Sequence, residues 1–142
     1  MKLTVACVLS LALAACAARS TSDAVAPAPT LADKLLGSRW RLEDLGGATV
    51  LERIEATLAF PEPGRVAGSA SCNRFVGTVE IDDGLIHIGR LATTRRLCRP
   101  PAIKQETRYL KALQSAERIA LDGSALLIYS AGIAKPLRYS RR

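Results

Sequence analysis

The stretch GSASCNRFVGTVEIDDGLIHIGRLATTRRLC, residues Gly68–Cys98, decides the fold of this 142-residue chain. At its centre, Asp83 and Gly84 form a pair that tolerates a positive φ at both turn positions. Apolar runs flank the pair in FVGTVEID and LIHIGRL. The stretch therefore predicts a tight antiparallel β-hairpin.

Similar short runs recur at intervals of about ten residues on both sides of this hairpin. They are WRLEDL, ATLAF, RVAGSA, ERIAL, SALLIYS and KPLRYS, and a second Asp-Gly pair separates ERIAL from SALLIYS. The length fits one domain. Roughly eight short strands with turns between most neighbours predict a mainly β fold, an antiparallel barrel or sandwich.

One segment, PPAIKQETRYLKALQSA, has a different pattern. It contains helix formers almost throughout, and its prolines stand at the start, where a missing N–H costs nothing. We expect a helix over about 102–115 that covers one mouth of a barrel, which makes the fold class α+β. The helix spacing predicts an inward face of Ile103, Glu106, Leu110 and Leu113.

Glu106 on an apolar stripe needs a partner, because burying an unpaired carboxylate costs several kcal/mol. Arg74 is one candidate partner, and Arg95 and Arg96 are two others. The functional alternative is a general acid or base with a raised pKa. No second carboxylate or histidine falls near Glu106 in a predicted element, so we expect a structural ion pair.

The N-terminus, MKLTVACVLSLALAACAARS, has the order of parts of a secretory signal peptide: one cation, an apolar run and small residues. The end of the run, Leu13-Ala14-Ala15-Cys16, resembles the bacterial lipobox, in which the cysteine is acylated and becomes the mature N-terminus. We therefore expect a lipoprotein signal peptide over 1–15 and lipidation of Cys16. The alternative is ordinary cleavage among the alanines, with secretion to the periplasm.

Residues 16–33 are rich in Ala, Ser, Thr and Pro, and we interpret them as the lipidated N-terminus and a flexible tether. Ala17 follows the cysteine, where Asp would favour retention in the inner membrane. The expected address is the bacterial cell envelope, at the periplasmic face of the outer membrane.

The mature chain is basic, because loss of 1–15 removes Lys2 and no acidic residue and lowers the formal charge from +7 to +6. The densest run of cations contains Arg90, Arg95, Arg96, Arg99, Lys104, Arg108 and Lys111, with Glu106 as the one acidic residue among them. This predicted basic surface suits lipid phosphates or an acidic envelope partner. We expect no nucleic-acid ligand outside the cytoplasm.

Cys72 and Cys98 remain once Cys7 leaves with the signal peptide and Cys16 carries lipid. In an oxidising compartment they could form a disulfide that closes a loop of about 27 residues and adds about 3.5 kcal/mol of stability. The alternatives are two inert thiols, or a reactive thiol activated by nearby arginines. His87 is the single histidine, so the sequence predicts no histidine triad, metal site or cofactor.

The stretch Gly68–Cys98 resembles the core of the META domain family, the HslJ-like bacterial heat-shock proteins and lipoproteins. The likeness continues through the glutamate of KQETRYLKAL and the upstream GSRWRLEDLGG. Ser71 departs from the family's usual Gly, and Arg96-Leu97 from Met-Ala. The resemblance implies a compact β-barrel-like domain over 34–142 with one packed helix and no established catalysis.

The same resemblance assigns structural roles to the SCNRF loop. We expect this loop to dock near Cys98 and the helix, with Asn73 capping local backbone, Arg74 meeting Glu106, and Phe75 completing the motif.

Members of the family are associated with envelope stress and drug tolerance, and their fold is similar to that of a lipid-binding pilotin. We therefore expect a non-enzymatic envelope lipoprotein. One alternative is a pilotin-like carrier that binds an acyl chain or amphipathic peptide in its barrel. A second alternative is an enzyme that depends on Cys72.

Overall fold

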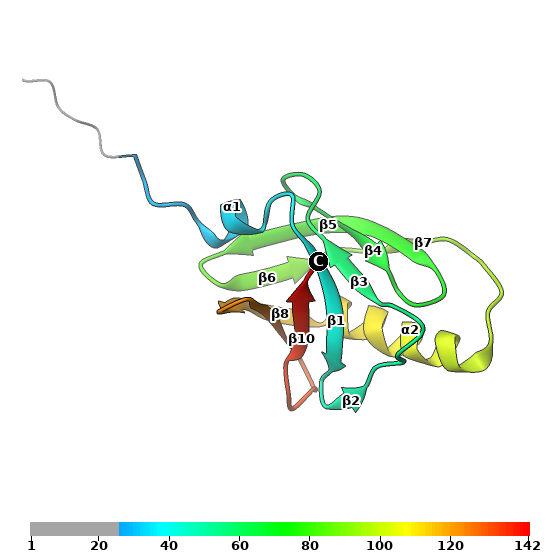
Figure 1. Cartoon of the computed structure of the whole chain (residues 1–142). Coiled ribbons are helices and arrows are strands. Elements are labelled where there is room, and N and C mark those ends of the chain that lie inside the picture. Colours follow the sequence, from blue (N-terminus) through cyan, green and yellow to red (C-terminus); the bar gives the residue numbers. More distant parts are fainter. Residues whose placement is uncertain (1–25) are drawn as a thin grey trace, which may run out of the picture.

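Eight antiparallel strands close into a barrel in this computed structural model, which describes residues 26–142 (Figure 1). The order around the barrel is β1-β3-β4-β5-β6-β8-β9-β10, and pairing of β10 with β1 completes the ring. The strands are β1 (Arg39–Leu45), β3 (Thr57–Ala59), β4 (Arg65–Ser69), β5 (Arg74–Asp82), β6 (Leu85–Ile88), β8 (Ala116–Asp122), β9 (Ala125–Ser130) and β10 (Leu137–Arg141). The predicted mainly β barrel is confirmed.

Two further strands are two residues long and were not predicted. Strand β2 (Ala48–Thr49) pairs with β1, and β7 (Ala92–Thr93) pairs with β5. The long helix, α2 (Pro100–Gln114), begins at the predicted prolines and agrees with the predicted range within two residues. A short helix, α1 (Leu31–Leu35), lies across the domain boundary expected at residue 34.

The hairpins form where the Asp-Gly pairs predict them. Asp83 and Gly84 have φ values of 43° and 80° between β5 and β6, and Ile81 pairs with Ile86 across this hairpin. Gly123 has a φ of 58° in the turn between β8 and β9. Positive φ at these positions turns the chain in the sense that matches the right-handed twist of paired strands.

The core lies inside the barrel, because alternate residues of each strand point inward. In β1, Trp40 and Leu42 are buried while their neighbours are exposed. The Tyr109 ring enters this core from α2, where it packs against Phe75 on β5 and lies 6.4 Å from the Tyr139 ring on β10. Since β5 and β10 lie on different sides of the ring, α2 closes one opening of the barrel, as expected.

The predicted inward face of α2 is confirmed at Leu113 and is wrong by about one residue at its other three positions. The buried residues are Ala102, Gln105, Tyr109, Ala112 and Leu113. Ile103 is 43% exposed, and Glu106 and Leu110 are half-buried. Gln105 and Tyr109 can face the barrel because their polar atoms form hydrogen bonds there.

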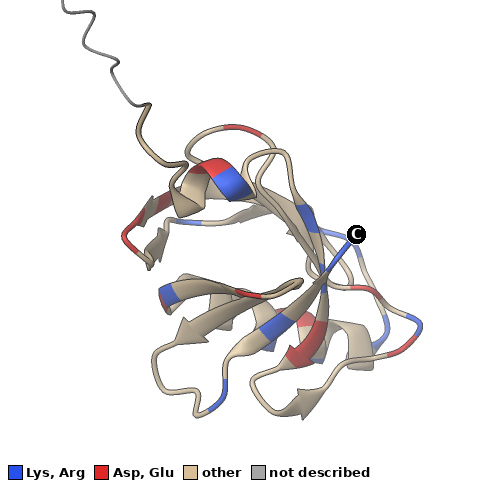
Figure 2. Ribbon diagram, turned by 60° about the vertical axis from the view of Figure 1, so that its left-hand side comes forward, with Lys and Arg blue, Asp and Glu red and all other residues tan. Residues whose placement is uncertain are grey.

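Helix α1 has a capping box at its start. The Asp33 N–H donates to Thr30 Oγ1 at 3.2 Å, and the Thr30 N–H donates to Asp33 Oδ2 at 2.9 Å. Leu35 at the other end is fully buried, so α1 is attached to the barrel. This helix carries one acidic and one basic residue, seen as red and blue on its ribbon (Figure 2).

Candidate functional site

The SCNRF loop is joined to the segment before α2 by a disulfide. Cys72 and Cys98 form it with Cα atoms 5.9 Å apart, a usual separation for such a bridge. Cys72 is buried and Cys98 is half-buried. The disulfide fixes the start of α2 against the loop that enters β5.

Glu106 is bound by the loop itself. Its Oε2 accepts hydrogen bonds from the Cys72 N–H at 3.2 Å and the Asn73 N–H at 2.6 Å, and its Oε1 accepts one from Asn73 Nδ2 at 2.9 Å. Three donors to one carboxylate form a strong, charge-assisted contact. Glu106 thus holds α2 to the loop that the disulfide also reaches.

The predicted ion pair between Arg74 and Glu106 is therefore wrong. Within residues 26–142, Glu106 makes no salt bridge to Arg74, Arg95 or Arg96. The physical reason is strand alternation: Arg74 begins β5 with its side chain exposed, and the next residue, Phe75, points into the core. The amide of Asn73 takes the place that was assigned to the guanidinium.

Asn73 also binds the segment that leads to Cys98. Its Oδ1 accepts hydrogen bonds from Thr94 Oγ1 at 2.8 Å and from the Arg96 N–H at 2.7 Å. It therefore serves a backbone group distant in sequence rather than the local backbone predicted for it. We call Cys72, Asn73, Thr94, Cys98 and Glu106 the polar junction.

Gln105 is a site residue that the sequence interpretation missed. It is buried, its Oε1 accepts from the Leu51 N–H at 2.8 Å, and its Nε2 donates to Ser71 Oγ at 2.7 Å and to the Ile54 carbonyl at 3.3 Å. The available signal was its i, i+4 spacing to Tyr109. A search for hydrophobic periodicity does not count a polar residue such as glutamine, so the signal was missed. Gln105 ties α2 to two loops at once.

The two buried tyrosines complete the attachment of the helix. The Tyr109 hydroxyl donates to the Thr57 carbonyl at 3.2 Å and accepts from the Tyr139 hydroxyl at 3.3 Å. Burial raises the pKa of both hydroxyls above the ordinary value, because the interior disfavours the phenolate.

All seven cations of the predicted basic surface are exposed. Lys104, Arg108 and Lys111 share one side of α2, spaced four and three residues apart. Arg95, Arg96 and Arg99 lie in the segment around Cys98, beside the fully exposed Leu97. Elsewhere on the ribbon, cations and anions are mixed (Figure 2).

Cys16 and the signal segment 1–15 lie outside the described residues, as does most of the predicted tether. Within 26–142, no group of three His, Cys, Asp or Glu side chains could hold a metal ion. No helix in that range is long and apolar enough to cross a membrane.

Comparisons with known proteins identify solved structures with a similar fold. A protein structure determined by NMR is 25% identical, with a TM-score of 0.64 over 78% of this chain and 94% of that one. An NMR structure of a protein from Burkholderia xenovorans is 23% identical, with a TM-score of 0.65 over 87% and 97% of the two chains. No curated protein sequence matches at a significant level. The META domain matches residues 33–141, so the resemblance seen in the sequence is confirmed and the chain belongs to the META domain family.

Proposed function

We propose that this protein is a non-enzymatic envelope lipoprotein, acylated at Cys16 and anchored at the periplasmic face of the outer membrane, where it contributes to envelope maintenance or stress tolerance. The observation that carries the proposal is a disulfide in a domain that follows a lipobox-like Leu13–Cys16 sequence. Disulfides form and persist in oxidising compartments, of which the periplasm is one.

The groups that could perform chemistry are already engaged in structural contacts. Cys72 is in the disulfide, so it offers no thiolate nucleophile. Glu106, the candidate general acid or base, accepts three hydrogen bonds from the loop that it holds. Both facts favour a binding or structural role over a Cys72-dependent enzyme.

The carrier alternative requires space inside the barrel for an acyl chain or peptide. Large side chains that are at most 1% exposed fill that interior, among them Trp40, Phe75, Tyr109 and Tyr139. An acyl chain would have to displace this packing. We therefore favour a protein that binds its partner on the outside.

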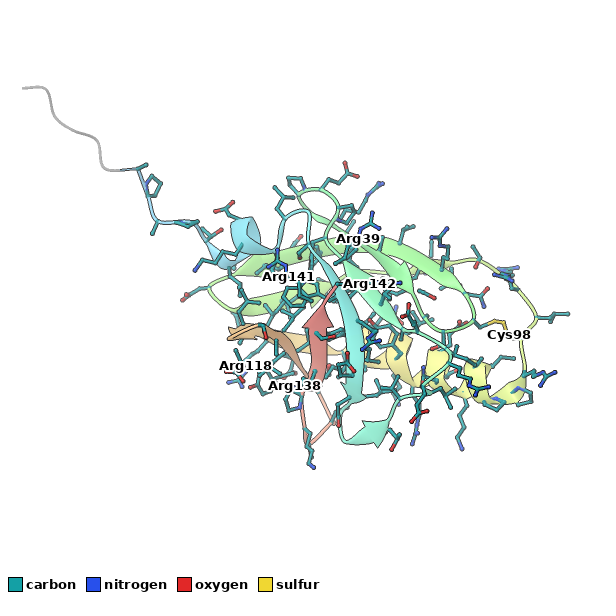
Figure 3. All side chains as sticks on the ribbon, in the orientation of Figure 1. Arg39, Cys98, Arg118, Arg138, Arg141 and Arg142 are labelled. Atoms are coloured by element: carbon teal, nitrogen blue, oxygen red, sulfur yellow. A yellow bond between two sulfur atoms is a disulfide. The ribbon has the colours of Figure 1, made fainter. Side chains whose placement is uncertain are left out.

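The partner is an acidic envelope protein rather than the lipid surface in which Cys16 is anchored. Helix α1, near the start of the described residues, and the Cys98 segment lie at opposite ends of the molecule (Figure 1 and Figure 3). A tether that leads to α1 would leave Arg95, Arg99 and Leu97 facing the periplasm. There, an exposed leucine amid cations suits a protein surface with complementary charge.

The test is metabolic labelling with a palmitate analogue, combined with membrane fractionation. Cys16→Ala should abolish labelling and move the protein out of the outer-membrane fraction. Cys7→Ala is the matched control, because it removes a cysteine from the same segment, and it should retain both label and location. Labelling that survives Cys16→Ala would refute the lipid anchor.

A further inference from the structure

A groove of about 1270 Å³ crosses the outer face of β1, β3, β4 and β5. Small outward-facing residues of β3 and β4, such as Ala59 and Ala67, form its floor, whereas inward-facing neighbours such as Leu58 and Val66 belong to the core. Ala59 pairs with Arg39 on one side and with Ala67 on the other, and Ala67 pairs with Val76. The row therefore runs from an arginine over two methyl groups to a half-exposed valine.

Four arginines stand around this floor: Arg39, Arg53, Arg74 and Arg142. All four are exposed, and among the described residues Glu55 is the one acidic residue that lines the groove. Glu55 is bound to Arg142 at 2.9 Å, whereas within residues 26–142 the other three arginines make no salt bridge. The groove thus has an excess of positive charge, which comes from Arg39, Arg53 and Arg74.

Two of these three arginines, Arg39 and Arg74, lie on the outer strands of the groove, β1 and β5. Arg39 and Arg142 are neighbours at one end, because the Arg142 N–H donates to the Arg39 carbonyl at 2.9 Å (Figure 3). Arg74 stands at the other end, on β5. Three strand spacings, about 14 Å, separate β1 from β5, and Arg74 lies two residues along β5 from Val76, where the row from Arg39 ends. The two backbone positions are therefore about 16 Å apart, a separation that the long arginine and glutamate side chains reduce.

An extended peptide fits this spacing. Alternate residues of an extended chain point to the same side, and residues i and i+4 are about 13 Å apart. Carboxylates at those positions reach the two arginine groups, while the small residues between them lie over Ala59 and Ala67. The arginine guanidinium donates two parallel hydrogen bonds to one carboxylate, a geometry that a lysine ammonium does not provide.

We propose that this groove binds an extended segment of an acidic protein partner, with two carboxylates four residues apart. The strands under the groove are paired on both sides, so recognition there depends on side chains rather than on a free sheet edge. A flat lipid surface does not reach a concave floor, and a single phosphate spans only one arginine group. The site is distinct from the basic surface around α2 and does not depend on the lipid anchor.

The experiment measures binding of a labelled peptide, Thr-Glu-Val-Thr-Val-Glu-Thr, to the purified protein in a non-ionic detergent at low ionic strength. Arg39→Gln and Arg74→Gln should each weaken binding about tenfold, as expected for loss of a charged hydrogen-bonded contact. Arg118→Gln is the charge-matched control. Arg118 lies on β8, across the barrel from the groove. The Arg118→Gln variant should therefore bind the peptide as tightly as the parent protein does.

Two further measurements test the shape of the groove and the nature of its occupant. Ala67→Leu changes no charge but fills the floor, and it should also weaken binding. The peptide with both glutamates changed to glutamine should not bind. Equal losses in Arg39→Gln and Arg118→Gln would overturn the proposal. So would binding of phosphatidylglycerol vesicles, or of inorganic phosphate, that displaces the peptide and depends on the same two arginines.

Discussion

Asn73 connects three chain segments through one amide group. The amide donates to Glu106 on α2 and accepts from Thr94 and the Arg96 backbone, and the residue itself enters β5. An amide can do this because it has donors and an acceptor on one planar group, whereas a carboxylate only accepts and a guanidinium only donates. Asn73 is therefore more important to this site than its charged neighbour Arg74.

Glu106→Gln tests the polar junction. The substitution leaves one acceptor oxygen and turns an NH₂ group toward N–H donors, so it should lower the free energy of unfolding by about 2 kcal/mol. Urea denaturation measures the change. Glu117→Gln, on an exposed position of β8, is the control and should have little effect. Equal stability of the two variants would show that Glu106 does not hold the loop.

Ser71 has an unusual backbone conformation for a residue with a side chain. Its φ is 97°, in the region that favours glycine, and its hydroxyl accepts a hydrogen bond from Gln105. Ser71→Ala should lose the hydrogen bond and keep the strain, whereas Ser71→Gly loses the bond and removes the strain. The glycine variant should therefore be more stable than the alanine variant by about 1 kcal/mol in urea denaturation. The reverse order would contradict a strained position.

At the scale of elements, α2 shows which parts of the fold a sequence can predict. Its limits followed from Pro100 and the run of helix formers, but its inward face did not, because Ile103 and Leu110 outweigh Gln105 in any apolar periodicity. The partners of Gln105 lie in loops 34 to 54 residues earlier, which a local pattern does not contain. The hairpins were predictable because Asp83-Gly84 is a local signal.

The Cys72–Cys98 disulfide fastens the start of α2 to the loop that enters β5, across a sequence separation of 26 residues. Its removal in Cys72→Ser/Cys98→Ser should lower the free energy of unfolding by about 3 to 4 kcal/mol, because the unfolded chain regains the entropy of an open loop. Urea denaturation with and without a reductant measures this. Reductant should lower the midpoint of the parent to that of the variant and leave the variant unchanged. An unchanged parent midpoint would contradict the role assigned to the bridge.

At the scale of the whole molecule, a closed barrel and a helix across one opening enclose Tyr109 and Tyr139. Their folded pKa values lie above the unfolded value of about 10, so their contribution to stability is complete below that pH and is lost as the pH rises above it. In that range, each tyrosine should lower the free energy of unfolding by about 1.4 kcal/mol per pH unit.

Urea denaturation between pH 9 and 11 checks this dependence. The parent should lose stability steeply above about pH 10, and Tyr139→Phe should show a shallower slope because one of the two ionising groups is gone. Tyr139→Phe keeps the hydrogen bond from Tyr109 to Thr57, so the rest of the core contact remains. Identical slopes in the two proteins would show that Tyr139 does not titrate with unfolding.

The barrel was predictable as a whole, since strand-length runs and turn signals recur along the sequence. The groove was not, because Arg39, Arg53, Arg74 and Arg142 are far apart in the chain and only the strand order assembles them. Similarly, the polar junction depends on which of two adjacent residues points inward at the start of β5. Such features follow from register, which short local patterns do not determine.

The most direct test of an anchored, disulfide-closed META domain is the intact mass of the protein extracted from membranes, with and without reduction before thiol alkylation. We predict a mass that begins at an acylated Cys16, with Cys72 and Cys98 alkylated only after reduction. A mass without acyl chains would contradict the anchor. Alkylation of Cys72 and Cys98 without reduction would contradict the disulfide and make Cys72 available as a reactive thiol.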